Sequence, residues 1–174
     1  NSNSSLSLDE IRKLITESEI ISKLNYPLIT QIIGICFNYE FNDQTMAVMV
    51  SEYCENGTIK NFIRSKKSDT FSQKMNDTRR LICIYGIASA MKYLHSHKIV
   101  HGCLKPSNIL LDEFFHPKIN DFCPTKKTEF DDLTVPYMAP EVIDKNVFSQ
   151  QADVYSFGII VHEILTGKRP DLFK

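Results

Sequence analysis

Residues 101–108 read His-Gly-Cys-Leu-Lys-Pro-Ser-Asn, and this stretch decides the fold when it is taken with two shorter ones downstream. Asp-Phe-Cys follows at residues 121–123, and Met-Ala-Pro-Glu follows at residues 138–141. Asp121 lies eighteen residues after Cys103, and Glu141 lies twenty residues after Asp121. Each cluster alone is weak evidence, but three clusters in a fixed order and spacing form a specific pattern.

Predicted helices flank the three clusters. A helix is expected over residues 80–97, with its apolar stripe formed by Ile84, Ile87, Ala88, Met91 and Leu94. A second is expected over residues 150–166 and should end at Gly167, with Val154, Phe157, Val161 and Ile164 facing inward. Two short apolar runs, at residues 109–111 and 118–119, separate the first two clusters.

The first third of the chain predicts a helix followed by strands. A capping box at residues 7–10 starts the helix, which should end near Pro27. Residues 28–37 and 46–53 are apolar and β-branched, which is typical of strands, and a polar turn at residues 38–45 should join them. A short helix is expected to end near residue 63. Strands that precede a mainly helical part indicate an α+β fold.

Composition excludes several classes of protein. The 174 residues carry a net charge of −1, so there is no overall basic field for nucleic acid or an anionic membrane. No apolar stretch is long enough for a membrane span, and residues 1–7 lack the features of a signal peptide. The five cysteines form no Cys-x-x-Cys pair, which favours reduced thiols in a cytoplasmic protein.

In order and wording, the three clusters resemble the catalytic loop, the metal-binding segment and the Ala-Pro-Glu segment of eukaryotic-type protein kinases. The likeness extends from about residue 9 to residue 170. Lys105 and Thr134 follow the Ser/Thr-type pattern, and residues 93–95 and 153–158 resemble the tyrosine-kinase-like group. The resemblance implies a kinase-like fold over residues 1–174. Residues 1–53 would form a partial N-lobe, with the family's αC helix, short antiparallel strands and the hinge, and residues 54–174 a mostly helical C-lobe.

The resemblance also assigns roles to individual residues. Asp121 and Asn108 would be oxygen ligands for Mg²⁺, which prefers such ligands, and Lys105 would neutralise the transferring phosphate. In the predicted cofactor site, Glu17 stands where the family has a glutamate on its αC helix. The other predicted ATP contacts are the hinge residues Glu52 and Cys54, behind the small Ser51, and the apolar floor residue Leu110.

Several positions depart from the family pattern. Cys103 replaces the aspartate that acts as general base, and a thiol with a reference pKa of about 8.5 is mostly neutral and a weak acceptor at pH 7. Losing a positioned base costs about 10²–10⁴-fold in rate. Gly102 replaces the arginine that binds a phosphorylated activation loop, and Cys123 replaces a glycine that eases switching. Leu133 is a milder departure.

The family's glycine-rich loop and ATP-binding lysine would lie before Asn1, and the partner of Glu141 would lie beyond the last residue. We therefore expect the sequence to be truncated at both ends relative to the family. Binding of ATP and Mg²⁺ is then expected to be weak or absent.

Other interpretations of the same residues stay open. His101 and Cys103 could form a Cys–His nucleophile, although residues two apart rarely present that geometry. Cys103 and Cys123 could form a disulfide or bind a metal. Asn108 and Asp121 could serve only to fix loops by hydrogen bonds. Five residues occupy the positions of the family's internal spine and are expected to lie in the core: Ile21, Ile32, His101, Phe122 and Asp153.

The leading functional hypothesis is a pseudokinase that regulates or scaffolds signalling through protein partners. The alternative is a low-activity Ser/Thr kinase that transfers the γ-phosphate of ATP to protein hydroxyls.

Overall fold

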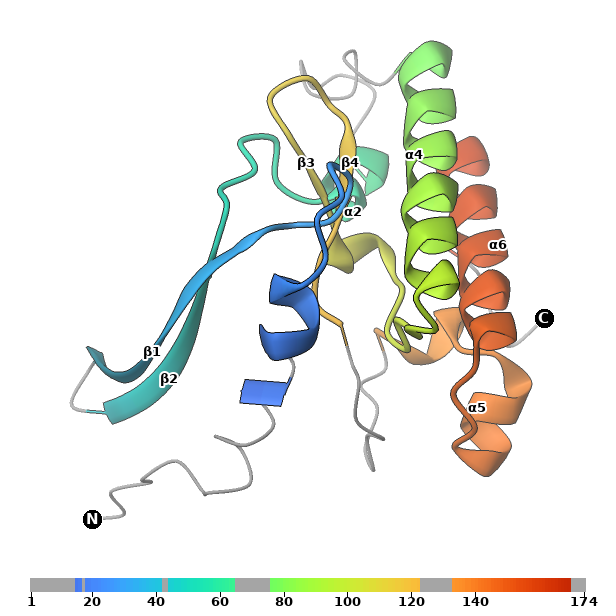
Figure 1. The fold of residues 1–174 in the computed structure, drawn as a ribbon. Coiled ribbons are helices and arrows are strands. Elements are labelled where there is room, and N and C mark those ends of the chain that lie inside the picture. The colour runs from blue at the N-terminus through green and yellow to red at the C-terminus, as the bar shows by residue number, and fades with distance from the viewer. Residues whose placement is uncertain (1–14, 17, 42–43, 65–75, 123–132, 170–174) are drawn as a thin grey trace.

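An antiparallel hairpin is followed by a mainly helical part, so the predicted α+β order is confirmed. The computed structural model describes residues 15–16, 18–41, 44–64, 76–122 and 133–169. In Figure 1 the hairpin of β1 (Ile32–Phe41) and β2 (Gln44–Ser51) projects to one side, and α4 (Asp77–Ser96) and α6 (Gln150–Thr166) run together on the other. The short pair β3 (Ile109–Leu111) and β4 (Pro117–Ile119) lies between them.

Shorter elements complete the described part of the chain. These are α2 (Ile59–Arg64), the 3₁₀ turns η1 (Pro106–Asn108) and η2 (Val135–Tyr137), and α5 (Pro140–Lys145). The helical residues 18–22, on the N-terminal side of the hairpin, fall within the first predicted helix. The capping box predicted at residues 7–10 lies outside the described residues.

The β1–β2 hairpin is longer than predicted. Tyr39 pairs with Met46, and the ladder continues to Phe41 opposite Gln44, so most of the predicted turn at residues 38–45 is strand. The turn was predicted from the polar side chains of these residues. This prediction was wrong, because paired strands are joined by hydrogen bonds between backbone groups, which polar residues also carry. The predicted start at residue 28 was also wrong: Ile29 instead forms an isolated parallel bridge with Ile119.

Helix α4 begins three residues before the predicted start, because Asn76 caps it. The Asn76 side chain accepts a hydrogen bond from the Arg79 amide at 2.9 Å, which satisfies one of the free amides of the first turn. The buried face differs from the predicted stripe, since Ile84 and Ala88 are only half-buried. It consists of Cys83, Gly86, Ile87, Ala90, Met91 and Leu94.

Helix α6 has the predicted bounds, and both caps are local. The Ser149 hydroxyl accepts the Ala152 amide at 3.1 Å, and Gly167 ends the helix in the left-handed conformation at φ 69°. The predicted inward position of Val154 is wrong, since this side chain is 60% exposed. The inward face instead includes Asp153, Ser156 and Glu163, which an apolar pattern does not detect.

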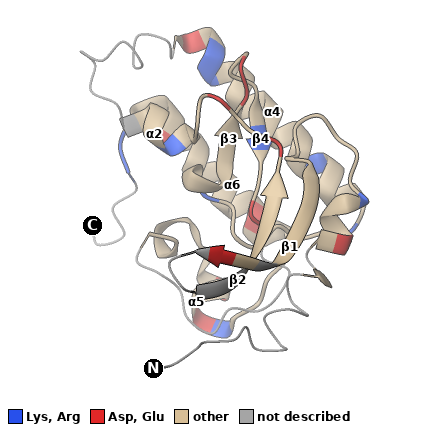
Figure 2. Ribbon diagram, turned by 90° about the vertical axis from the view of Figure 1, so that its left-hand side faces the viewer, with Lys and Arg blue, Asp and Glu red and all other residues tan. Residues whose placement is uncertain are grey.

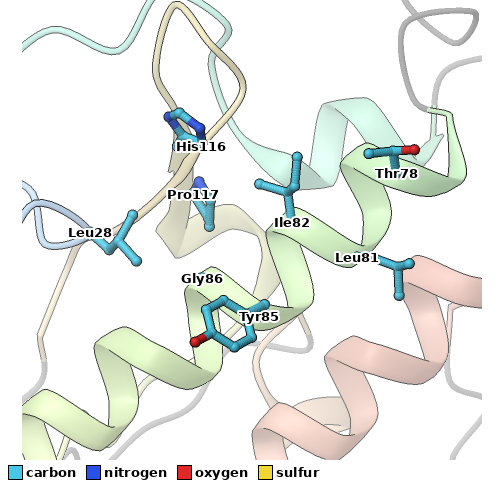
Figure 3. A pocket seen from close by; sticks show the side chains of 8 residues that line it. All are labelled: Leu28, Thr78, Leu81, Ile82, Tyr85, Gly86, His116 and Pro117. Carbon is cyan, nitrogen blue, oxygen red and sulfur yellow. The ribbon is translucent and has the colours of Figure 1, made fainter.

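The core joins α4 and α6 to the β3–β4 pair, and one glycine sets how closely α4 approaches β4. A Cβ atom on Gly86 would lie 2.5 Å from Cγ of Pro117, nearer than side-chain packing allows. Figure 3 shows Gly86 beneath Pro117, beside a hollow of about 380 Å³ whose lining includes Leu28 and Ile82. The small residue therefore permits the contact between the helix and the strand.

Charged residues are distributed over several elements of the described chain. Figure 2 shows Lys and Arg on α2, α4 and β4, with Asp and Glu interspersed. This distribution agrees with the net charge of −1 and with the absence of a basic field in the sequence. Within the described ranges, no helix combines the length and the apolar character needed to cross a bilayer.

Candidate functional site

The loop at residues 101–108 runs from the end of α4 to β3 and is held by a carboxylate on α6. Asp153, which is 2% exposed, accepts the His101 amide at 2.8 Å through Oδ2 and the Gly102 amide at 2.9 Å through Oδ1. Oδ2 also accepts His95 Nε2 at 2.9 Å. One buried carboxylate thus fixes two consecutive peptide units of the loop and the last turn of α4.

Gly102 adopts φ 73°, the left-handed region that a side chain with a Cβ atom disfavours. The two hydrogen bonds that the His101 and Gly102 amides donate to Asp153 stabilise the backbone that leads into this turn. Gly102, which stands where the family pattern has an arginine, therefore also suits the left-handed backbone of the loop.

His101 is buried, and both of its ring nitrogens bind backbone groups. Nδ1 accepts the Cys103 amide at 3.2 Å, so Nε2 carries the proton and donates to the carbonyl oxygen of Asn120 at 3.1 Å. Burial lowers the pKa of His101, and the nearby Asp153 only partly offsets this, so the ring is neutral at pH 7. These bonds disfavour the Cys–His nucleophile.

The His101 ring stacks on Phe122, with centroids 4.9 Å apart and planes 28° apart. Ile21 and Phe122 are buried in the main core, and Ile32 packs against it. The structure thus brings the residues predicted as an internal spine into one core, with Asp153 bound to His101.

Cys103 occupies the predicted general-base position and is 7% exposed. Its carbonyl oxygen accepts Nδ2 of Asn108 at 2.9 Å, which closes the loop on itself. This bond gives Asn108 the loop-fixing role that was one of the two interpretations of this residue. Cys123, the second member of the suggested cysteine pair, lies outside the described residues.

Asn108 and Asp121 are brought close by the backbone. The Asn120 amide donates to the carbonyl of Asn108 at 2.9 Å, which places Asp121 one residue from this contact. Asp121 is exposed and adopts φ 56°, while Asn108 is buried with its Nδ2 already used. Amide and carboxylate oxygens suit Mg²⁺, which keeps several waters and binds substrate phosphates, so these two residues fit a magnesium site of that kind.

Lys105 and Thr134 meet across the loop. Nζ of Lys105 donates to Oγ1 of Thr134 at 2.7 Å, and Thr134 is buried just before η2. The bond joins the predicted catalytic loop to the segment before Glu141. The two residues that follow the Ser/Thr-type pattern in the sequence are therefore in direct contact.

The residues just after the predicted hinge lie beside β3. The Asn56 amide donates to the carbonyl of Leu111 at 3.2 Å, and the Leu111 amide donates to the carbonyl of Gly57 at 2.8 Å. Leu110, next to Leu111, is half-buried and forms an isolated antiparallel bridge with Thr58. Cys54 is buried, and burial raises the pKa of its thiol, with the Glu52 charge adding to the effect.

Two residues singled out in the sequence, the predicted cofactor contact Glu17 and the substituted Cys123, lie outside the described residues.

Two contacts of charged residues were missed by the sequence reasoning. Lys118 on β4 binds Glu52 with Nζ–Oε distances of 2.9 and 2.7 Å, and Tyr137 donates to Oε2 of the buried Glu163 at 2.5 Å. Neither pair shares a motif or a helical spacing, so no local signal could have identified it. The hollow beside Gly86 (Figure 3) includes none of the predicted site residues.

Comparisons with known proteins add independent findings. Residues 2–172 match the family model described as protein tyrosine and serine/threonine kinase. A probable serine/threonine-protein kinase of Dictyostelium discoideum is 34% identical over 98% of this chain and 13% of its own length. Cysteine-rich receptor-like protein kinase 10 of Oryza sativa subsp. japonica is 36% identical over 91% of this chain and 25% of its own length. Wall-associated receptor kinase-like 18 of Arabidopsis thaliana is 31% identical over 93% of this chain and 21% of its own length. The chain thus spans a quarter or less of these relatives.

Proposed function

Since the chain belongs to the protein tyrosine and serine/threonine kinase family, we propose that it is a pseudokinase, a regulatory or scaffolding module that acts through protein partners. The observation that carries the proposal is the buried Cys103 at the position of the catalytic base. In this proposal residues 1–53 form the partial N-lobe with the hinge, and residues 54–174 form the C-lobe.

A thiol cannot replace the carboxylate in orienting and deprotonating a substrate hydroxyl. Cys103 is buried, so a substrate hydroxyl beside it would lose its hydrogen bonds to water. The thiol is a weak acceptor and would replace these bonds poorly. The neutral His101 does not substitute for it, because both ring nitrogens are engaged by the backbone. In this proposal the loop has the residue order of the family's catalytic loop without its base.

Residual binding of ATP with Mg²⁺ is part of the proposal. The nucleotide and the metal would supply the transferable phosphoryl group and its charge neutralisation. Asp121 and Asn108 would hold the metal, Lys105 would face the phosphate, and residues 52–54 with Leu110 would contact the adenine. Backbone hydrogen bonds support this arrangement: Asn120, next to Asp121, binds Asn108, and Leu111, next to Leu110, binds Asn56 and Gly57 just after the hinge.

A second candidate is a low-activity Ser/Thr kinase, and one contact favours it. The 2.7 Å bond between Lys105 and Thr134 holds the lysine of the loop in place, and the carboxylate of Asp121 stays exposed. Positioning and electrostatics supply most of the catalysis in phosphoryl transfer, so slow turnover does not require the base.

Substitution at Cys103 in the full-length protein tests the two candidates. Phosphoryl transfer from radiolabelled ATP and binding of Mg-ATP by calorimetry are measured for the wild type, Cys103→Asp and the base-free control Cys103→Ser. A pseudokinase that lacks only the base should gain about 10²–10⁴-fold in transfer with aspartate and nothing with serine.

The result that would overturn the pseudokinase is robust transfer by the wild type that is abolished by Asp121→Ala. Asp144→Ala removes an exposed carboxylate on α5 and is the matched control. Absence of Mg-ATP binding in the wild type would remove the nucleotide part of the proposal and leave the scaffold part.

For location, we propose the cytoplasm. The support is the cysteine pattern of the sequence, with four described cysteines present as free thiols.

A further inference from the structure

Tyr53, in the predicted hinge, is more exposed than any other tyrosine of this chain. All seven tyrosines lie within the described residues. Tyr53 is 85% exposed, followed by Tyr85 at 78%, Tyr39 at 46% and Tyr155 at 39%. The other three are half-buried or buried. Tyr53 is therefore the tyrosine that other molecules meet most freely.

The backbone at Tyr53 also differs from the backbone at the other exposed tyrosines. Tyr85 lies within α4 and Tyr155 within α6, so the neighbouring turns of a helix flank each ring. Tyr39 is paired with Met46 in the β1–β2 ladder. Tyr53 belongs to the segment that connects β2 to α2 (Figure 1), outside any helix or strand. Its amide, carbonyl and hydroxyl form no hydrogen bond with another described residue.

The contacts that hold this segment lie on either side of Tyr53. Before it, the Glu52 amide donates to the carbonyl of Gln31 at 2.9 Å, and the Glu52 carboxylate is ion-paired. After it, the Gly57 amide donates to the carbonyl of Cys54 at 3.2 Å. Opening the segment would break these few contacts and leave the core in place, which is the kind of local opening that folded proteins undergo.

Phosphoryl transfer sets strict demands on the acceptor, and Tyr53 meets them best. The acceptor oxygen must come within about 3–3.5 Å of the donor phosphorus, inside a cleft that excludes water. A helical or paired tyrosine brings its neighbouring turns or its partner strand with it. An extended segment enters such a cleft alone and pairs its backbone groups with the enzyme.

We propose that Tyr53 is a phosphorylation site for a separate protein tyrosine kinase, with Mg-ATP as the donor. The phenolic oxygen forms the new bond to the γ-phosphorus, the bond from the γ-phosphorus to the oxygen that bridges the β- and γ-phosphates breaks, and ADP leaves. The phenolic proton passes to the base of the acting kinase. Residues 1–174 supply only the acceptor, so this modification does not rest on the proposed function.

The phosphate would change the charge of the predicted hinge. It carries about −1.5 to −2 at pH 7. Glu55, two residues after Tyr53, is exposed and adds a negative charge there, whereas the cation Lys118 is already bound to Glu52. A phosphorylated Tyr53 next to the predicted adenine contacts Glu52 and Cys54 should therefore repel Mg-ATP, which is also anionic. This regulatory consequence rests on the proposed function.

Labelling by an added kinase tests the site. The full-length protein and the variants Tyr53→Phe and Tyr85→Phe are incubated with the catalytic domain of a broad-specificity tyrosine kinase and radiolabelled Mg-ATP. Mass spectrometry locates and quantifies the phosphate on residues 1–174, and a blank without the added kinase removes any transfer by the protein itself. Tyr53→Phe should lower the rate of labelling by about tenfold, because the other tyrosines must first be released from a helix, a ladder or the core. Tyr85→Phe, the matched control at the next most exposed tyrosine, should keep the wild-type rate.

A synthetic peptide of residues 48–58 separates sequence from access. Labelling of both the peptide and the folded protein at Tyr53 is the expected result. A peptide that is labelled while the folded protein is not would mean that the contacts around Tyr53 keep the segment closed, and the proposal would fail. It would fail equally if neither is labelled, or if Tyr85 or Tyr39 is labelled as fast as Tyr53.

Calorimetry with Mg-ATP measures the consequence. Where the unmodified protein binds, phosphorylation should weaken binding by about threefold to tenfold, the repulsion expected in water between two dianions roughly 10 Å apart. The same treatment of Tyr53→Phe should leave the affinity as it was before treatment, and an unchanged affinity of the phosphorylated wild type would refute the regulatory effect. Where the unmodified protein does not bind, the nucleotide part of the proposed function fails, while the labelling experiment still decides the modification of Tyr53.

Discussion

Replacing Asp153 with asparagine should strongly destabilise the chain, because the substitution keeps the shape and removes one of two acceptor atoms. The Asp153 carboxylate accepts three hydrogen bonds, two through Oδ2 and one through Oδ1. The least costly asparagine rotamer keeps its oxygen toward His101 and His95. Its NH₂ group then faces the Gly102 amide, which is also a donor.

The magnitude follows from these three bonds. Hydrogen bonds to a charged group contribute about 1.5–3 kcal/mol each and neutral ones about 1 kcal/mol, so the two retained bonds lose roughly 1–4 kcal/mol together. The lost bond and the unsatisfied Gly102 amide cost about 2–3 kcal/mol more. The expected loss is about 3–7 kcal/mol, a large part of the 5–15 kcal/mol typical of a domain.

Urea unfolding followed by far-ultraviolet circular dichroism measures this loss, since the chain has no tryptophan for fluorescence. Asp144→Asn, on the exposed side of α5, should change the free energy of unfolding by less than about 0.5 kcal/mol. A loss below about 1 kcal/mol for Asp153→Asn, or equal losses for both variants, would refute the reasoning.

Two further predictions concern stability. Gly86→Ala should lower the free energy of unfolding by about 1–3 kcal/mol, because its Cβ would meet the rigid ring of Pro117. Gly158→Ala, at a position on α6 with open space, should instead raise the free energy of unfolding by about 0.5–1 kcal/mol. Melting temperatures that shift in the same direction for both variants would contradict this. Burial lowers the pKa of His101 in the folded state, so protonation of this ring should oppose folding. In urea titrations the free energy of unfolding should not depend on His101 above about pH 6.5, and should fall by up to roughly 1.4 kcal/mol per pH unit below it. A His101→Gln variant with the same pH slope would exclude this origin.

The parts of the fold that local chemistry determines were predictable. The bounds of α6 depend on Ser149 and Gly167, two caps that act within one turn of the chain. The earlier start of α4 was readable in principle, since Asn76, four residues before the predicted start, is a strong capping residue. The length of the β1–β2 hairpin was not readable, because backbone pairing carries no side-chain pattern.

The candidate site divides in the same way. The loop at residues 101–108 was recognisable because its residue types keep a fixed spacing. The sequence marked Lys105 and Thr134 as Ser/Thr-type but did not predict the contact between them. The ion pair between Glu52 and Lys118 was not recognisable, since the two residues are 66 positions apart and no motif links them. Val154 shows the converse error, an apolar residue that faces solvent because Asp153 and Ser156 have partners inside.

Gly102 has a consequence for which residues this position tolerates. With glycine in place, the left-handed turn at φ 73° is free of strain, and a side chain there would cost about 1–2 kcal/mol. Every substitution of Gly102 therefore begins with a loss of stability, whatever the new side chain could bind. The backbone of the loop by itself selects for glycine at this residue.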